Sequence, residues 1–233
     1  MPHSAVPSLL SLGRRSALET MEALTLSLAK DANGAVPGSG RGTGPLCLLA
    51  LDGTCGNGRD TLWLAAGLRA LRQSHAAAFR WSVLALDIQE RALASAGQRL
   101  AEEGLLDLVT FARQGHEELE AILGRMRAAR PEPLALGLGV YNLGYLPGGD
   151  KGIRTSAPHT LRSLEAALRV LVPGGMLLVH AYAGHAGGPE ELEAVRAFAC
   201  GLSESEFSAA SYALCNKSRN PEALFLISRR RIR

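Results

Sequence analysis

The sequence predicts an α/β fold, with a mostly parallel sheet covered by helices on both faces. From Pro45 onward, short apolar runs alternate with longer segments that have helical periodicity. The short runs are apolar at nearly every position, as expected for strands that are buried on both faces. The chain has 233 residues, of which 47% are hydrophobic, and this is enough for one domain with a sizeable core.

Seven strands are expected, and the last two follow one another to close the sheet. They are expected at residues 46–51, 81–86, 108–112, 134–141, 176–182, 207–214 and 223–228. Five helices are expected between them, at residues 59–71, 89–103, 117–129, 157–171 and 190–201. Strands that alternate with helices in this way imply parallel strands joined by helical crossovers.

The N-terminal residues are set apart from this alternating pattern. Residues 14–30 have the periodicity of an amphipathic helix. Its apolar stripe consists of Ala17, Met21, Leu24 and Leu28. Residues 31–44, DANGAVPGSGRGTG, are rich in Gly, Pro and Ser, which is typical of a mobile connector. We therefore expect a helix and a flexible connector at residues 1–44, followed by one domain at residues 45–233.

The composition argues against several classes of protein. The net charge is +3 with His neutral, so a nucleic-acid partner would need a local basic patch. No apolar run reaches the ~20 residues needed to cross a bilayer, so no membrane partner is expected. The cysteines Cys47, Cys55, Cys200 and Cys215 form neither a CxxC pair nor a zinc-finger spacing. We therefore expect reduced thiols and no metal.

The expected location is the cytoplasm, or a plastid or other organelle if the source is a plant or alga. Residues 1–30 hold Arg14, Arg15 and several serines, but also Glu19 and Glu22, so a transit peptide stays open. An apolar helix face or an edge strand also leaves a homodimer open.

The loop after the first strand has the sequence DGTCGNGRDT, at residues 52–61. Ligands of open α/β sheets bind at the carboxyl ends of the strands, so this loop is a candidate site. Gly56 and Gly58 permit a tight turn and a close approach of the backbone to a ligand. Thr61 stands where a dinucleotide-binding G-x-G-x-x-G loop has its third glycine, and the carboxylate of Asp52 suits an ammonium better than a pyrophosphate. S-adenosylmethionine has an ammonium, a sulfonium and no phosphate.

S-adenosylmethionine is therefore the expected cofactor. Its expected contacts in this loop are Asp52, Thr54, Cys55, Gly56, Asn57, Gly58, Asp60 and Thr61. Two simpler interpretations stay open. G-x-G alone also fits an ordinary strand-to-helix turn, and Asp60 and Thr61 could cap the helix that follows.

The loops after the second and third strands supply further candidates for cofactor contact. Asp87, followed by Ile88 and Gln89, ends the second strand, where a carboxylate accepts hydrogen bonds from both ribose hydroxyls of an adenosine. Asp87 could instead cap the next helix. His116 follows the third strand, where an adenine edge or a ribose could be met, although a lone histidine is more often structural.

The loop after the fourth strand is the most informative segment. It has the sequence NLGYLPGGDK, at residues 142–151, and its opening N-x-x-Y resembles the (D/N/S)-P-P-Y loop of amino-group methyltransferases. An amine attacks with its lone pair, so its N–H groups need acceptors that leave the lone pair aimed at the methyl group. The Asn142 side-chain oxygen and the Leu143 carbonyl can serve as acceptors, and the Tyr145 ring can pack against the substrate. Asn142 is also an expected cofactor contact. A Gly/Pro-rich turn is the structural alternative.

Three segments together resemble one bacterial and plant-organellar family of class I S-adenosylmethionine-dependent methyltransferases. They are D-x-T-C-G-N-G-x-D-T, D-I-Q and N-L-G-Y-L-P-G-G-D-K. The family was long described as rRNA methylases, and it is similar to the enzymes that convert 5-aminomethyl-2-thiouridine to 5-methylaminomethyl-2-thiouridine at the tRNA wobble position. The resemblance covers about residues 46–229 and includes Tyr182 and His185, with residues 216–221 diverged. Arg59 departs from the family pattern, which usually has His there.

The resemblance implies a Rossmann-like methyltransferase fold and the tRNA anticodon region as the substrate. The glycine loop would bind the methionine part of the cofactor, and Asp87 its ribose. Transfer would be a direct in-line displacement, with His185 or water taking the proton of the amine and Lys151 contacting RNA phosphate. The implied catalytic residues are Asn142, Tyr145, Asp150 and His185. The implied substrate-binding residues are Leu143, Gly144, Tyr145, Lys151, Tyr182 and His185.

Two other functions stay open. One is a methyltransferase of the same fold acting on rRNA or on a small-molecule or protein amine. The other is a non-catalytic nucleotide-binding module, against which the missing third glycine and the N-L-G-Y loop both argue. Candidates for RNA phosphate contact are Arg154, Arg162, Lys217, Arg219 and residues 228–233, although each basic residue alone is more often solvated surface.

Overall fold

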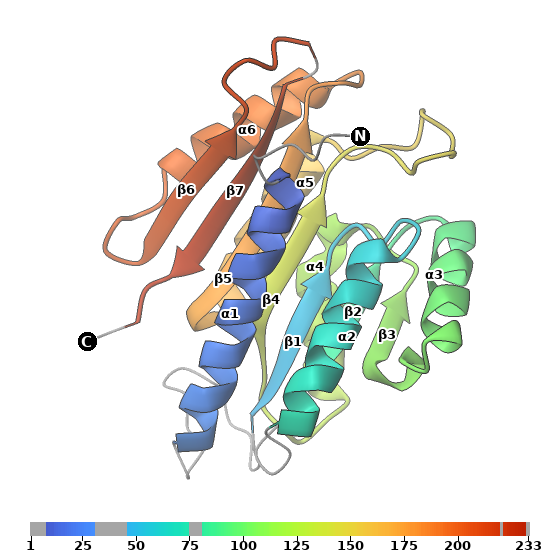
Figure 1. Cartoon of the computed structure of the whole chain (residues 1–233), viewed down its shortest axis with the longest axis vertical. Helices are drawn as coiled ribbons and strands as arrows, with labels where there is room; N and C mark the ends of the chain where they lie inside the picture. Colours follow the sequence, from blue (N-terminus) through green and yellow to red (C-terminus); the bar gives the residue numbers. More distant parts are fainter. Residues whose placement is uncertain (1–7, 31–45, 75–80, 220, 232–233) are drawn as a thin grey trace, which may run out of the picture.

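The computed structural model describes residues 8–30, 46–74, 81–219 and 221–231. Its strands are β1 (Cys47–Asp52), β2 (Trp81–Leu86), β3 (Val109–Ala112), β4 (Leu134–Asn142), β5 (Leu171–Tyr182), β6 (Phe207–Ala213) and β7 (Glu222–Arg229). They form one seven-stranded sheet in the order β3-β2-β1-β4-β5-β7-β6 (Figure 1). Strands β1 to β5 are parallel, β7 is antiparallel to β5, and β6 is antiparallel to β7. The predicted mostly parallel seven-stranded sheet is confirmed.

Helices cover both faces of this sheet (Figure 1). The α-helices are α1 (Leu9–Lys30), α2 (Arg59–Ser74), α3 (Glu90–Glu102), α4 (Leu119–Ala128), α5 (Ala157–Val170) and α6 (Gly188–Cys200), and η1 (Leu106–Leu108) and η2 (His116–Glu118) are short 3₁₀ helices. On one face, α1 packs against β4, β5 and β7, and α2 against β1 and β2. On the other face, α5 packs against β4, and α6 against β5, β6 and β7.

Helix α1 completes the layer over β4, β5 and β7. Ala17, Met21 and Leu24, which were predicted to share one stripe, are buried in the same apolar cluster as Leu224 of β7. A Cβ on Gly13 would lie 2.9 Å from a Leu224 methyl group, so the helix backbone approaches the strand closely. Burial of this stripe contributes to the same hydrophobic core that holds the sheet.

Two element boundaries differ from the prediction by five residues, and the other boundaries differ by less. Helix α1 begins at Leu9, five residues earlier than expected, and β5 begins at Leu171 instead of residue 176. Pro173 disfavours the helical conformation at the residue before it, so α5 ends and the chain enters β5 early. Gly174 has φ 83°, and the pairing of β5 with β4 shifts register at this point. The extra residues are therefore absorbed as an irregularity at the start of β5.

The connector predicted at residues 31–44 and the side chain of Leu28 lie outside the described residues. Within the described ranges, no helix is both long and apolar enough to span a membrane.

Replacing Met21 by Ala tests the packing of α1. Met21 is fully buried, so Met21→Ala should lower the free energy of unfolding by about 2–5 kcal/mol, from lost burial and the cavity left behind. Glu22→Ala is the matched control, because Glu22 is the exposed next residue of the same helix and should change stability by no more than about 0.5 kcal/mol. Urea denaturation measures both, and equal stability of the two variants would contradict the packing of α1.

Candidate functional site

Hydrogen bonds join the loops that follow β1, β2 and β4 at the carboxyl edge of the sheet. The Gly53 N–H donates to the Val140 carbonyl at 2.9 Å, which links the first loop to β4. The Cys55 N–H donates to the Leu86 carbonyl at 2.8 Å, which links it to β2. These loops follow adjacent strands, so the structure brings the three predicted motifs together.

A side-chain contact ties the glycine loop to the N-L-G-Y loop. The backbone N–H of Asn142 donates to Thr54 Oγ1 at 2.7 Å. Thr54 in turn donates its own N–H to Asp52 Oδ1 at 3.2 Å. The start of one predicted motif is thus fixed directly against the start of the other.

Two glycines of the first loop allow close approach of neighbouring elements. A Cβ on Gly53 would lie 2.4 Å from the ring of Tyr141, and a Cβ on Gly58 would lie 2.5 Å from Ala96 of α3. Gly58 also has φ 75°, which L side chains rarely adopt. The sequence pattern singled out Gly56 and Gly58 but not Gly53, because the need for glycine there depends on a residue 88 positions away.

Asp52 lies beneath the glycine loop and is 1% exposed. Its Oδ2 accepts a hydrogen bond from Thr61 Oγ1 at 2.6 Å, and its Oδ1 accepts the Thr54 N–H. Burial, followed by the nearby charge of Asp60, raises the pKa of Asp52 to about 7. The Asp52 carboxyl therefore binds the loop itself, and its predicted contact with a cofactor ammonium stays a prediction.

Asp60, the second residue of α2, connects the site to α1. Its Oδ1 lies 2.7 Å from Nη2 of Arg14, in a partly buried ion pair. The Arg14 guanidinium also lies 5.5 Å from the centre of the Trp63 ring, within the range of a cation–π contact. Asp60 is therefore engaged by the protein, and the N-terminal helix helps to position the start of α2.

The Asp87 carboxylate bridges the first and second loops. Its Oδ2 accepts the Gly56 N–H at 2.9 Å, and its Oδ1 accepts the Gln89 N–H at 2.8 Å. The N-cap residue of α3 is Gln89 and not Asp87. Asp87 is partly exposed, and the side chain of its neighbour Ile88 is 52% exposed. Asp87 and Ile88 thus lie where a ligand at this edge could meet both.

His116 packs behind the first loop. It is buried, its ring meets the Tyr141 ring edge-on at 6.1 Å, and it hydrogen bonds the backbone of Gly53. Burial lowers its pKa, so the imidazole is neutral near pH 7. Its Nε2 has no hydrogen-bond partner among the described residues. A cofactor contact of His116 stays a prediction.

The remaining cofactor candidates of the first loop are the thiol Cys55 and the turn residue Asn57. Cys55 is buried, and its Sγ lies 3.3 Å from Thr61 Oγ1. Burial strongly raises the pKa of this thiol, so it stays protonated and is not an activated nucleophile. The Asn57 carbonyl accepts a hydrogen bond from Arg99 Nε at 3.1 Å, while its side chain is partly exposed.

The N-L-G-Y loop is held by a buried glutamate that sequence reasoning missed. Glu191 of α6 is 1% exposed, and it accepts hydrogen bonds from Thr155 Oγ1 and Thr160 Oγ1, both at 2.6 Å. Because the Thr155 hydroxyl donates to Glu191, its oxygen is free to accept the Gly144 N–H at 2.8 Å. The Thr155 N–H also donates to the Gly144 carbonyl at 2.8 Å. The N–H and the carbonyl of Gly144 are therefore both fixed to Thr155, which Glu191 links to α6.

The residues predicted for the substrate side gather around Tyr145. Its side chain is 37% exposed, and its ring meets that of His185 edge-on at 6.2 Å. The Lys151 Nζ lies 5.7 Å from the centre of the Tyr145 ring. Leu143 is buried. A Cβ added to Gly144 would lie 3.6 Å from the His185 ring. Asp150 is different, because its exposed carboxylate accepts the Gly152 N–H at 2.7 Å and so stabilises the local turn.

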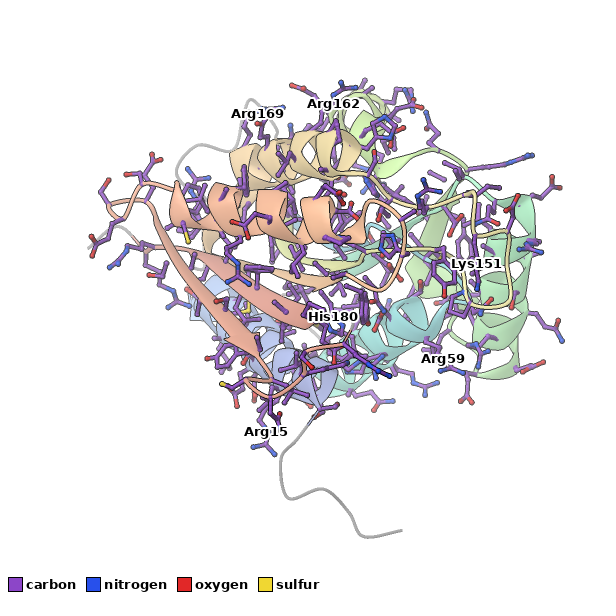
Figure 2. All side chains as sticks on the ribbon, turned by 90° about the horizontal axis from the view of Figure 1, so that it is seen from above. Arg15, Arg59, Lys151, Arg162, Arg169 and His180 are labelled. Atoms are coloured by element: carbon purple, nitrogen blue, oxygen red, sulfur yellow. The ribbon has the colours of Figure 1, made fainter. Side chains whose placement is uncertain are left out.

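Tyr182 and His180, at the end of β5, form a second group beside Asn142. The Tyr182 Oη lies 2.7 Å from Nδ1 of His180, and Asn142 contributes a side-chain hydrogen bond to the same hydroxyl. Figure 2 views the molecule from above and shows His180 near its middle, with Lys151 and Arg59 displaced toward α3 and α2. Arg59 is exposed at the start of α2. Sequence reasoning did not single out His180.

Among the described residues, no group of three or more His, Cys, Asp or Glu side chains is arranged to hold a metal ion.

Comparison with known proteins agrees with this architecture. The family model “Putative rRNA methylase” matches residues 83–228. A curated relative from Arabidopsis thaliana, the chloroplastic tRNA (mnm⁵s²U34)-methyltransferase, is 36% identical over 185 residues. The match covers 77% of this chain and 62% of the relative, so the chain spans less than two thirds of that protein.

Two solved structures are similar over most of the chain. A protein of Clostridium thermocellum described as a putative rRNA methylase has a TM-score of 0.66 and 28% identity, covering 88% of this chain and 97% of that one. A Streptococcus mutans protein described as a putative methyltransferase, solved in complex with SAH, also has a TM-score of 0.66. It is 23% identical and covers 96% of this chain and 99% of that one, and it supports the fold.

The raised pKa of Asp52 predicts a pH dependence of stability. Between the ordinary value of 3.8 and about 7, the folded state keeps a proton that the unfolded state releases. The free energy of unfolding of the wild type, measured relative to Asp52→Asn, should therefore fall as the pH rises from 4 to 7 and then level off. Asp107→Asn, at an exposed aspartate, is the control and should follow the wild type. Parallel curves for wild type and Asp52→Asn would rule out the raised pKa.

The hold of Thr155 on Gly144 can be tested with two isosteric variants. Thr155→Val and Thr160→Val each remove one hydrogen bond to Glu191, and each should lower the free energy of unfolding by about 1–3 kcal/mol. Only Thr155→Val also removes the partner of the Gly144 N–H. Hydrogen exchange of the Gly144 amide should therefore accelerate in Thr155→Val and not in Thr160→Val. Equal protection of this amide in both variants would contradict the role of Thr155.

Proposed function

Because the chain belongs to the family described as “Putative rRNA methylase”, we propose that it is an S-adenosylmethionine-dependent N-methyltransferase. Its proposed reaction converts 5-aminomethyl-2-thiouridine to 5-methylaminomethyl-2-thiouridine at the wobble position of tRNA. The observation that carries this proposal is the direct hydrogen bond from Asn142, which opens the substrate loop, to Thr54 of the glycine loop. The Arabidopsis relative, named for this tRNA position, supports the same substrate.

The residues of the first and second loops fit the proposed cofactor. Gly56 and Gly58 have φ of 51° and 75°, which L side chains rarely adopt, so glycine at these positions allows the tight turn that would present the loop to a ligand. The Asp87 carboxylate uses two of its about four lone-pair sites for Gly56 and Gln89, which leaves acceptors for ribose hydroxyls. The exposed side chain of Ile88 offers an apolar surface to an adenine ring. When bound, the cofactor supplies a methyl group on a sulfonium, whose sulfur is a good leaving group because it departs as a neutral thioether.

The N-L-G-Y loop would orient the nucleophilic nitrogen. The Asn142 side-chain oxygen and the Leu143 carbonyl accept the N–H groups of the amine, so that its lone pair stays free for attack. The half-exposed Tyr145 ring, flanked by His185 and Lys151, packs against the substrate. Because Thr155 fixes Gly144 within this loop, the acceptors are held in place before substrate arrives.

The amine must be neutral to attack. A free alkylamine resembles Lys, with a pKa of about 10, so the site must favour loss of its proton. Desolvation against buried Leu143 and the nearby positive charge of Lys151 both lower such a pKa. His185 or water takes the proton, and transfer then needs neither a metal nor a covalent enzyme intermediate.

The proposed RNA contacts begin at Lys151, at the exposed edge of this pocket. Lys151 and Arg154 are exposed in the substrate loop, and Arg162 is exposed on α5 (Figure 2). Positive charge here would contact the phosphates around the anticodon and set the register of the RNA. The wobble base would be read while unstacked, as in most recognition of single-stranded RNA.

The family description and the Clostridium structure favour one other substrate, rRNA. The reaction at nitrogen would be the same, and the RNA would differ. We also propose the cytoplasm as the location, or a plastid as for the chloroplastic relative. A homodimer would use the sheet edge at β6, where Ser208 to Ala213 are exposed.

The proposal is tested with labelled S-adenosylmethionine and tRNA from a strain that lacks the modification. Nucleoside mass analysis should show 5-aminomethyl-2-thiouridine gaining one methyl group. Asn142→Ala should keep cofactor affinity within about threefold and lower kcat on the order of 100-fold, because only the orienting acceptor is lost. Gln98→Ala, at an exposed residue of α3, is the control and should match the wild type.

Full turnover by Asn142→Ala would refute the orienting role. Methylation of rRNA but not tRNA would replace the proposed substrate by the second candidate. Turnover of a free amine without RNA would contradict both.

A further inference from the structure

A chain of polar side chains runs from β7 to Asn142 on the face of the sheet covered by α1. Asn142 of β4 pairs in register with His180 of β5, and Tyr182 pairs with Glu222 of β7. Residues that pair in register point to the same face, and so do residues two apart in one strand. His180, Tyr182, Asn142 and Glu222 therefore share one face, which is the face of the apolar cluster that contains Leu178 and α1.

The contacts along this chain are short. The Tyr182 Oη lies 2.7 Å from Nδ1 of His180, and the two rings are 4.2 Å apart. On the other side of the imidazole, Nε2 lies 3.3 Å from Oε2 of Glu222. The second oxygen of Glu222 accepts a hydrogen bond from Lys217 Nζ at 2.6 Å. His180 is 5% exposed, so its two ring nitrogens have these protein neighbours and little water.

The chemistry of each group sets the direction of every hydrogen bond. Nε2 of His180 makes no aligned hydrogen bond, but it faces the Glu222 carboxylate oxygen at 3.3 Å. A ring lone pair at this position would be repelled by the carboxylate, so Nε2 carries the proton. Burial lowers the pKa of His180, and the neutral ring then has Nδ1 as an acceptor. The Tyr182 hydroxyl therefore donates to Nδ1. Burial and Glu222 raise the pKa of Tyr182, so it keeps this proton.

With its proton directed to His180, the Tyr182 oxygen is left as an acceptor. Asn142, which shares a side-chain hydrogen bond with Tyr182, can then only donate to it through its NH₂ group. An amide that donates from its nitrogen toward Tyr182 turns its oxygen away from Tyr182. This oxygen is the acceptor that the proposed reaction requires for the substrate amine.

We propose that His180 is a positioning residue for methyl transfer, which acts through Tyr182 to turn the Asn142 side-chain oxygen toward the substrate nitrogen. This inference rests on the proposed function of Asn142. Without an acceptor at Nδ1, the Tyr182 hydroxyl is free to donate to the Asn142 oxygen and so competes with the amine. The loss of kcat caused by removing His180 therefore depends on the presence of the Tyr182 hydroxyl.

A double-mutant cycle tests this dependence. His180→Leu should lower kcat roughly tenfold or more, as expected for one misdirected hydrogen bond, while the KM for tRNA and the cofactor Kd stay within about threefold. In a Tyr182→Phe background, His180→Leu should change kcat by less than about twofold, because no hydroxyl remains to compete. His180→Asn, whose Oδ1 can stand in for Nδ1 as an acceptor, should recover kcat to within about threefold of the wild type.

Equal losses from His180→Leu in both backgrounds would overturn the inference, as would a His180→Asn enzyme as slow as His180→Leu. Neither result would affect the proposed function, since the wild type would still methylate tRNA. An inactive wild type would instead overturn the proposed function and, with it, any catalytic role of His180.

A second readout does not depend on activity. Nitrogen-15 correlation spectra of histidine-labelled protein, assigned with His180→Leu, should show His180 as the neutral Nε2–H tautomer at pH 7. A neutral Nδ1–H tautomer, or a charged ring, would overturn the direction of the hydrogen bonds on which the inference depends.

Discussion

The hydrogen bond from the Asn142 N–H to Thr54 Oγ1 is the contact on which the candidate site depends. It joins the loop that is expected to hold the cofactor to the loop that is expected to hold the substrate. Both loops follow adjacent parallel strands, so the sheet brings the two loops close together, and this hydrogen bond fixes the distance between them. A displacement reaction is sensitive to the distance and angle between its two reactants, and a rigid link between the two loops addresses that need directly.

The supports of these two loops come from both layers of helices. On the α1 face, Arg14 pairs with Asp60 at the start of α2, whose neighbour Thr61 holds Asp52 beneath the glycine loop. On the other face, Glu191 of α6 holds Thr155, and Thr155 holds Gly144. The N-terminal helix is thus part of the helical layer. Its apolar stripe packs on the sheet, and its Arg14 connects it to the site through the ion pair with Asp60.

The strands, their mostly parallel arrangement and the three site loops could be predicted from the sequence because each depends on local pattern. Asp87 and Asn142 stand directly after apolar runs, and the carboxyl ends of parallel strands meet at one edge. Glu191 and His180 could not be found in this way, because their roles depend on partners contributed by other elements. The sequence pattern also suggested that Asp52 meets the ammonium of a cofactor, which stays a prediction. The structure adds that the Asp52 carboxyl is buried and accepts hydrogen bonds from Thr54 and Thr61, which the sequence pattern could not show. Only the three-dimensional structure shows whether a loop side chain points into the protein or toward a ligand.

A crystal structure of the protein with bound S-adenosylmethionine would show whether the two loops form one reaction site. We expect ribose hydroxyls on the Asp87 carboxylate, the methionine part against the Gly56–Gly58 turn, and the Asn142 oxygen facing the transferable methyl group. A cofactor bound at another edge of the sheet, or an Asn142 oxygen turned away from that methyl group, would contradict it.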